Sequence, residues 1–256
     1  MKVAICFYGF LRQWRQTIPH WRSLFNAHDT NVFIHTWDTE QYKDRELGSF
    51  PYGNTADPLD ISGVTSSFNP TDILVESYKE KHPEILSITD WVYKERDKFI
   101  ALHPEHSNLV ENRVTSNYSM WYSWGKALEL KRKHEIGFVY DVVLLVRSDF
   151  ILSTIFDFSS VTQVVTPPWP DLEQNSTTQP WVNYDEGICD RWLYGPSKMM
   201  DMVGSMYANI VLFRELLLVR YDFERVINPH KIPAFWMKVN NIDYIKATTQ
   251  NGLQIR

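Results

Sequence analysis

An arginine and an aspartate follow a long apolar run in the middle of the chain, spaced so that both side chains face the same way. The run Val142–Val146 has five consecutive apolar residues, which predicts a strand buried on both faces. Side chains alternate along a strand, so Arg147 and Asp149 should point one way and Ser148 the other. Ligands bind at the carboxyl ends of strands in open α/β sheets. The pair is therefore a candidate ligand site; the alternative is an ion pair that closes a core strand.

Three carboxylates lie within six residues further along the chain. Asp185, Glu186 and Asp190 precede an aromatic segment, residues 191–195, that has the pattern of a strand. A carboxylate beside a reacting hydroxyl can take its proton as a general base. The three residues are therefore candidates for that role, and the alternative is that they are ordinary loop carboxylates.

Polar residues also follow the first two predicted strands. Gly9 follows the first strand, where it permits close approach to the backbone, and Arg12 on the next turn has a planar fork suited to phosphate oxygens. Asp38 ends the second strand, where a carboxylate can accept a hydrogen bond from a ribose hydroxyl or a base N–H. The alternatives are a surface arginine and an aspartate that caps a turn or helix. His35, on the same strand, is expected to be structural.

Apolar periodicity predicts the strands and helices that would position these residues. Strand, helix and strand within the first 40 residues make a βαβ unit and imply a parallel sheet. The polar segment Thr39–Asn69, with three glycines and two prolines, is expected to be a long loop. Strands are predicted at 2–8, 31–38, 72–76, 140–150, 161–166, 191–195 and 243–245, and helices at 17–25, 82–103, 115–137, 197–207, 209–220 and 230–239.

The composition excludes several classes of protein. The 256 residues, 44% of them hydrophobic, suffice for one large α/β domain. The net charge of −5 and the lack of a long basic block argue against a nucleic-acid partner. The densest basic run, Lys131–His134, ends a predicted helix and is expected to face solvent. No run of about 18 apolar residues predicts a membrane span. Two distant cysteines, Cys6 and Cys189, fit a reduced, cytoplasmic setting.

Five segments, in this order, resemble small bacterial and viral glycosyltransferases of the GT-A type, particularly those of lipopolysaccharide and surface-glycan synthesis. They are KVAICFYGFLR (2–12), NVFIHTWD (31–38), SNYSMWYSWGKA (116–127), YDVVLLVRSDF (140–150) and ICDRWLYG (188–195). The likeness covers roughly residues 1 to 210. It implies dependence on a nucleotide sugar and often on a divalent metal held by an Asp-x-Asp motif. In this sequence Arg147 replaces the first aspartate of that motif.

The resemblance also implies roles for individual residues. Asp190, which precedes the aromatic segment, is the implied general base, with Glu186 as the alternative. Asp149 would hold Mn²⁺ or Mg²⁺; in the other arrangement, Arg147 would neutralise the donor phosphates directly. The donor-binding residues are expected to be Tyr8, Gly9, Arg12, Asp38, Ser123, Lys126 and Arg147.

Together these features predict a single GT-A-like domain over residues 1–256. Residues 1–208 would form an α/β core, a Rossmann-like, mostly parallel sheet flanked by helices, and residues 209–256 a helical C-terminal annex. The expected activity is transfer of a sugar from a nucleotide-diphosphate sugar to a glycan or glycolipid acceptor. Two alternatives remain, a nucleotide-sugar-binding protein without turnover and a sugar nucleotidyltransferase. The second usually has a Gly-rich N-terminal loop, and the loop at residues 9–12 has one glycine.

Overall fold

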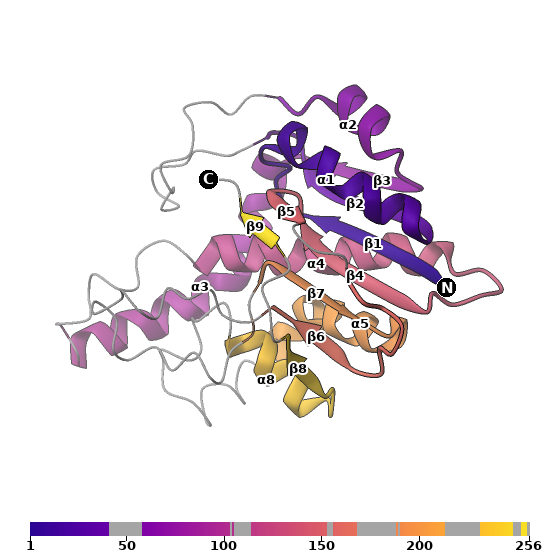
Figure 1. The fold of residues 1–256 in the computed structure, drawn as a ribbon. Coiled ribbons are helices and arrows are strands. Elements are labelled where there is room, and N and C mark those ends of the chain that lie inside the picture. The colour runs from indigo at the N-terminus through magenta and orange to yellow at the C-terminus, as the bar shows by residue number, and fades with distance from the viewer. Residues whose placement is uncertain are drawn as a thin grey trace.

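A seven-stranded sheet with helices on both faces forms the centre of the protein (Figure 1). The computed structural model describes residues 1–40, 58–102, 104, 114–152, 156–167, 188, 190–212, 231–247 and 252–254. In sheet order the strands are β3 (Asp72–Glu76), β2 (Asp29–Trp37), β1 (Lys2–Tyr8), β4 (Val142–Arg147), β7 (Trp192–Gly195), β6 (Val164–Thr166) and β8 (Tyr244–Lys246). A separate small sheet pairs β5 (Phe150–Leu152) with β9 (Gly252–Gln254). The prediction of an α/β fold with a mostly parallel sheet is confirmed.

Strand β1 lies between β2 and β4 and runs parallel to both. β3 is parallel to β2, whereas β7 is antiparallel to both of its neighbours, β4 and β6. The first four strands therefore have the order 3-2-1-4 of a Rossmann-like sheet. In such a sheet the strand order reverses between β1 and β4, and a crevice opens there at the carboxyl ends.

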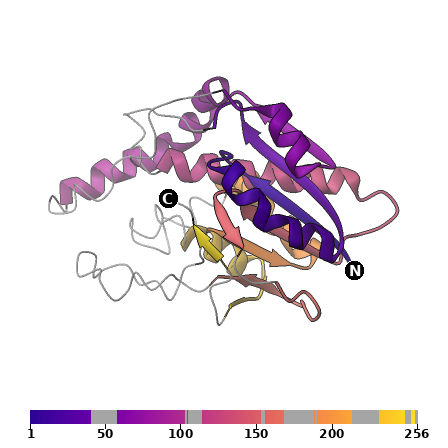
Figure 2. The same ribbon diagram turned by 45° about the horizontal axis from the view of Figure 1, so that its top comes forward.

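Alternate residues of β1 face opposite sides of the sheet and join two separate cores. On one face, the Phe7 ring lies 5.2 Å from that of Trp21 and 4.9 Å from that of Phe68. On the other face, the Tyr8 ring lies 5.6 Å from that of Trp124. Figure 2 shows helices above and below the sheet in the same way. The first face carries α1 (Trp14–Ala27) and α2 (Ile61–Phe68), and the second carries α3 (Tyr78–Leu102), α4 (Val114–His134), α5 (Ser197–Gly204) and α8 (Lys231–Val239).

The expectation of one long loop over Thr39–Asn69 is wrong, because α2 lies inside it. The Asp60 carboxylate accepts a hydrogen bond of 2.9 Å from the Gly63 N–H and so caps the helix. Val64 and Phe68, four residues apart, are buried against the sheet. The glycines and prolines of this segment predict a loop, and the amphipathic pattern of α2, eight residues long, is too short to predict a helix against them.

The C-terminal segment contributes to the main sheet as well as a helix. Helix α8 packs near α5, and β8 then pairs in parallel with β6, with Val164 opposite Tyr244. The expected short strand near residues 243–245 is thereby confirmed. None of the helices in the described ranges is long and apolar enough to cross a membrane.

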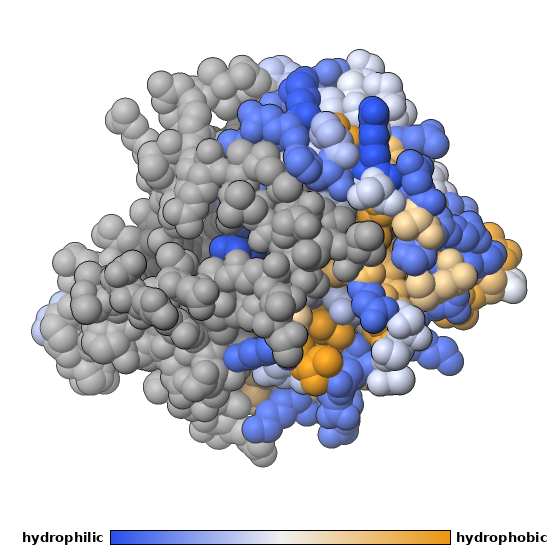
Figure 3. Space-filling view, in the orientation of Figure 1, coloured by the Kyte–Doolittle hydropathy of each residue, from blue (hydrophilic) through white to orange (hydrophobic). Residues whose placement is uncertain are grey.

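The described surface carries apolar patches away from α1 and α2. Figure 3 shows mainly hydrophilic surface over α1 and α2, and apolar surface both toward the end of the molecule where β1 begins and lower in the view, near β6. Ile136 and Val139, both exposed, lie in the connection that enters β4 at this amino edge. The carboxyl ends of β1 and β4 lie at the opposite edge.

A buried lysine joins the end of α4 to the start of α5. Lys131 is fully buried, and its ammonium donates to Ser197 Oγ at 2.6 Å, Glu135 Oε2 at 2.9 Å and Asp201 Oδ2 at 3.0 Å. All three of its N–H donors are used. The expectation that this basic run faces solvent is therefore wrong for Lys131. Burial raises the pKa of Asp201, and the neighbouring Lys131 opposes that rise.

We expect Lys131→Ala to lower the free energy of unfolding by about 3–5 kcal/mol, because two carboxylates would lose the cation between them. Urea unfolding at neutral pH measures the change. Lys133→Ala is the matched control, since Lys133 is 65% exposed and pairs only at the surface with Glu129. Its effect should stay within about 1 kcal/mol. Equal losses in both variants would contradict the role assigned to Lys131.

Candidate functional site at the carboxyl ends of β1 and β4

Five of the residues singled out in the sequence gather where β1 and β4 end. The parallel register sets Tyr8 opposite Arg147, so Gly9 and Asp149 follow at the same edge of the sheet. Asp190 joins them from the segment that leads into β7, the strand on the other side of β4. This edge is the point at which the strand order reverses.

Arg147 and Asp149 lie side by side, as expected, although β4 ends at Arg147 and residues 148–149 form a turn, so the strand expected over residues 140–150 is interrupted here. Arg147 Nε donates to Asp149 Oδ1 at 2.9 Å and Nη2 donates to Oδ2 at 2.5 Å, so the guanidinium and the carboxylate form a bidentate ion pair. The side chain of Arg147 is 22% exposed and that of Asp149 is 7% exposed. Burial lowers the pKa of Arg147, but Asp149 and Asp190 outweigh it, and the pKa is raised from its usual value.

Asp190 stands on the other side of the same guanidinium. Its Oδ2 lies 3.6 Å from Arg147 Nη1, longer than a hydrogen bond. The Tyr8 hydroxyl donates to the Asp190 backbone carbonyl, which ties the segment before β7 to the end of β1. Burial, together with Asp190, raises the pKa of Tyr8, so this hydroxyl remains a donor at neutral pH. Tyr8 thus supports Asp190 through its backbone, and the Asp190 carboxylate keeps its charge contact with Arg147.

The turn between Arg147 and Asp149 is held from behind by α1. Ser148 is buried and points away from the two charged residues, as predicted. The Thr17 hydroxyl donates to the Ser148 carbonyl at 2.6 Å, and the Ser148 hydroxyl donates to the Phe10 carbonyl at 3.5 Å. These bonds fix the turn against the β1–α1 loop, so the geometry of Arg147 depends on both elements.

Gly9 turns the chain from β1 towards α1. Its φ of +79° lies in the left-handed region that favours glycine. A Cβ built at Gly9 would meet no described atom within 4 Å, so conformation rather than crowding requires glycine here. The Gly9 N–H donates to Ser123 Oγ of α4 at 2.6 Å. This N–H is therefore already used, and a ligand at this turn would meet the open side of the Cα atom.

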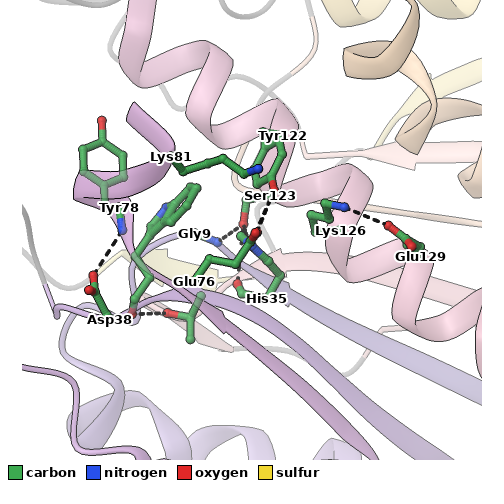
Figure 4. A network of polar contacts seen from close by, with 12 residues as sticks. Gly9, His35, Asp38, Glu76, Tyr78, Lys81, Tyr122, Ser123, Lys126 and Glu129 are labelled. Carbon is green, nitrogen blue, oxygen red and sulfur yellow. Dashed lines mark hydrogen bonds and ion pairs between the residues drawn. The ribbon is translucent and has the colours of Figure 1, made fainter. Parts of the chain in front are cut away.

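Ser123 belongs to a buried chain of hydrogen bonds that crosses three elements (Figure 4). Ser123 Oγ lies 2.6 Å from His35 Nδ1, and His35 Nε2 lies 2.8 Å from Glu76 Oε2. The hydrogen bond from His35, with one from Tyr122 and against partial burial, lowers the pKa of Glu76 to about 2. Burial lowers the pKa of His35, with Glu76 opposing, so the imidazole is neutral at pH 7.

The charge states of this chain determine the direction of every bond. An ionised Glu76 only accepts, so His35 donates from Nε2, and its Nδ1 must accept. The Ser123 hydroxyl then donates to His35 and accepts from the Gly9 N–H. The three residues hold the Gly9 turn in place. Because Ser123 and His35 are fully buried, they form no exposed nucleophilic triad. The structural role expected of His35 agrees with this arrangement.

Lys126 lies with this second network rather than with Arg147. Its ammonium pairs with Glu129 at 3.1 Å and stands 5.6 Å from the centre of the Tyr122 ring. Lys81 of α3 lies near the same ring, at 5.4 Å (Figure 4). The expected contact between Lys126 and donor phosphates stays a prediction.

Asp38 and Arg12 lie at the neighbouring carboxyl end of β2 and on the β1–α1 loop. Asp38 is exposed, and its Oδ1 accepts from the Tyr78 N–H at 3.2 Å at the start of α3, which agrees with the capping alternative. The Arg12 guanidinium carbon lies 5.6 Å from the centre of the Phe10 ring. Ligand roles for both residues stay predictions. Asp185 and Glu186, the other carboxylates considered as bases, lie outside the described residues.

Sequence reasoning missed Glu76, although one signal was available. It is the last residue of β3, a polar residue at the carboxyl end of a strand, as Arg147 and Asp38 are near the ends of theirs. Its partner His35 lies 41 residues away in the chain, and no local pattern links the two.

Comparison of the chain with models of known protein families found no match, and comparison with curated proteins found no similar sequence.

Glu76 should make the stability of the protein depend on pH in the acidic range. Its pKa falls from 4.5 to about 2 on folding, so its contribution is present above about 4.5 and lost as the pH falls towards 2. We expect a loss of about 1–2 kcal/mol across this window, after allowance for partial exposure. In Glu76→Gln, this part of the pH dependence should disappear. Urea unfolding between pH 6 and pH 2.5 measures it, and Glu84→Gln on α3 controls for removal of a carboxylate. A Glu76→Gln profile parallel to that of the wild type would contradict the assignment.

Proposed function

We propose that the protein is a glycosyltransferase of the GT-A type that moves a sugar from a nucleotide-diphosphate sugar to a glycan or glycolipid acceptor. The observation that carries the proposal is the meeting of Arg147, Asp149 and Asp190 at the reversal point of the sheet. That point is where nucleotide ligands bind in Rossmann-like sheets. A carboxylate to take a proton and a fixed cation to receive a diphosphate, placed at this edge of the sheet, are groups that glycosyl transfer from a diphosphate can use.

The strand order supports the same proposal. The order 3-2-1-4 is that of a nucleotide-binding sheet, and Gly9, Arg12 and Asp38 follow the carboxyl ends of its first two strands. The antiparallel β7 then brings Asp190 beside the end of β4. Donor-binding residues and a base would thus approach the sugar from two neighbouring parts of one sheet edge.

Asp190 is the proposed general base of an inverting transfer. Its carboxylate would take the proton of the acceptor hydroxyl as that oxygen forms its bond to the anomeric carbon. The bond from the anomeric carbon to the diphosphate breaks at the same time, and its electron pair stays on the phosphate oxygen. The Tyr8 bond to the Asp190 carbonyl would hold the base in position during this step. Every group invoked here lies on β1, β4 or the segment before β7.

A thermal-shift screen of nucleoside diphosphates and nucleotide sugars, followed by assay of donor consumption, tests the proposal. A nucleotide sugar at about 100 times its dissociation constant should add roughly 2.7 kcal/mol of stability. We expect stabilisation by one nucleotide series, with release of the nucleoside diphosphate when acceptor glycans or water are present. Stabilisation without any release would favour a nucleotide-sugar-binding protein that does not turn over. The absence of stabilisation by every nucleotide would contradict the proposal.

Asp190→Asn should lower the rate of transfer by about 10²–10⁴-fold without weakening donor binding, because the proton acceptor is lost while no group that attracts the donor is removed. Steady-state kinetics and donor titration separate the two effects. Asp141→Asn is the control: this carboxylate accepts from the Lys2 N–H at the amino edge of the same sheet, away from the proposed site. Wild-type turnover in Asp190→Asn would remove Asp190 from the reaction and direct attention to Glu186.

A further inference from the structure

Bond breakage at a glycosyl diphosphate leaves negative charge on the phosphate, and a preorganised cation stabilises it. We propose that the guanidinium of Arg147 is that cation, and that the site handles the diphosphate without a divalent metal. The inference rests on the proposed function for its meaning, but the phosphate site that it describes can be tested alone.

The described residues do not fit a divalent metal at Asp149. Both carboxylate oxygens of Asp149 are held by Arg147, at 2.9 and 2.5 Å, in a largely buried pair. A metal ion bound to these oxygens would displace the guanidinium or stand against its positive charge. Mg²⁺ also requires near-octahedral oxygen coordination. Over the described ranges of the chain, no group of three or more histidine, cysteine, aspartate or glutamate side chains is arranged to hold a metal ion.

Arg147 itself has the geometry that phosphate recognition requires. Two of its five N–H donors are engaged by Asp149, which fixes the plane and the direction of the fork. Nη1 lies 3.6 Å from Asp190, beyond hydrogen-bond distance, on a side chain that is 22% exposed. Within the described part of the chain, an edge of the guanidinium is therefore left for phosphate oxygens, which arginine can bind through two parallel bonds.

The charge of the cluster gives the proposal a distinctive consequence. One cation and two carboxylates carry a net charge of −1, so Asp190 repels an incoming phosphate while Arg147 attracts it. Removing the Asp190 charge should therefore strengthen metal-free phosphate binding. If a metal bridged the carboxylates and the phosphate, the same change would weaken binding, because the metal would lose a candidate ligand.

The test uses inorganic pyrophosphate, which lacks base and sugar, titrated calorimetrically into the full-length protein. In EDTA we expect saturable binding, because Arg147 supplies the cation and no Mg²⁺ is needed at the site. Asp190→Asn should bind pyrophosphate more tightly in EDTA, and Asp141→Asn, which loses the same charge at the other edge, should match the wild type.

The double variant Arg147→Gln/Asp149→Asn removes both charges while both side chains can still hydrogen-bond, which avoids a buried unpaired carboxylate. Thermal unfolding checks that it remains folded, and its pyrophosphate affinity should fall at least about tenfold. The single variant Arg147→Lys keeps the charge but loses the fork, and it should fall between the double variant and the wild type.

Pyrophosphate binding that requires Mg²⁺, or that weakens in Asp190→Asn, would overturn the inference, as would no binding under either condition. Metal-free binding that depends on Arg147, in a protein that consumes no nucleotide sugar, would sustain the inference and contradict the proposed function. Consumption of a nucleotide sugar only in the presence of Mg²⁺ would support the proposed function and contradict the inference that no metal is needed. The two ideas can therefore fail separately.

Discussion

The parallel pairing of β1 with β4 is the constraint on which the candidate site depends. Its register sets Tyr8 opposite Arg147, so the two strands end at the same level. A slip of one residue would exchange the two faces of β1 and move its side chains between the two cores. Because both faces of β1 are buried, the register is strongly specified, and with it the meeting of Gly9 with the turn after β4.

Two polar networks flank the end of β1, and burial determines what each can do. The network of Ser123, His35 and Glu76 is satisfied from end to end, so it holds the Gly9 turn rigidly and offers no reactive group. Among the described residues, the hydrogen bonds of the Arg147 guanidinium all go to one side, where Asp149 holds the fork. A buried polar group without partners is costly, so the edge left towards Asp190 and solvent is the part suited to a ligand. Rigidity on one side of β1 would thus support the chemistry that we propose on the other.

Much of the fold could be predicted from the sequence, because apolar runs and their period record burial directly. The strand at 72–76 was placed with its observed bounds. Arg147 and Asp149 lie together as expected, but a turn after β4 rather than a continued strand brings them together. The prediction that Lys131 faces solvent was wrong for a physical reason. A basic residue at a helix end is usually exposed, whereas two of the partners of this lysine lie on α5, 66 and 70 residues away in the chain. The hydrogen bond between His35 and Glu76 was not predicted for the same reason, because the two residues lie on different strands. Contacts between distant segments decide which polar residues cooperate, and local patterns do not record them.

An arginine at position 147 balances part of the negative charge that Asp149 and Asp190 bring to this strand end. An aspartate at position 147 would place three carboxylates around one strand end, and their mutual repulsion would have to be relieved by a bound cation or by a proton. With arginine there, Asp149 is paired from within the chain and Asp190 retains a nearby positive charge. The cost is that this cation cannot leave or be exchanged, so its position is fixed by the turn that Thr17 and Phe10 hold. In a site of this kind the position of the cation depends on the fold, whereas in a metal site the cation is a separate ion that binds to its ligands. The burial of Ser148 and the hydrogen bond from Thr17 to its carbonyl are consistent with that demand.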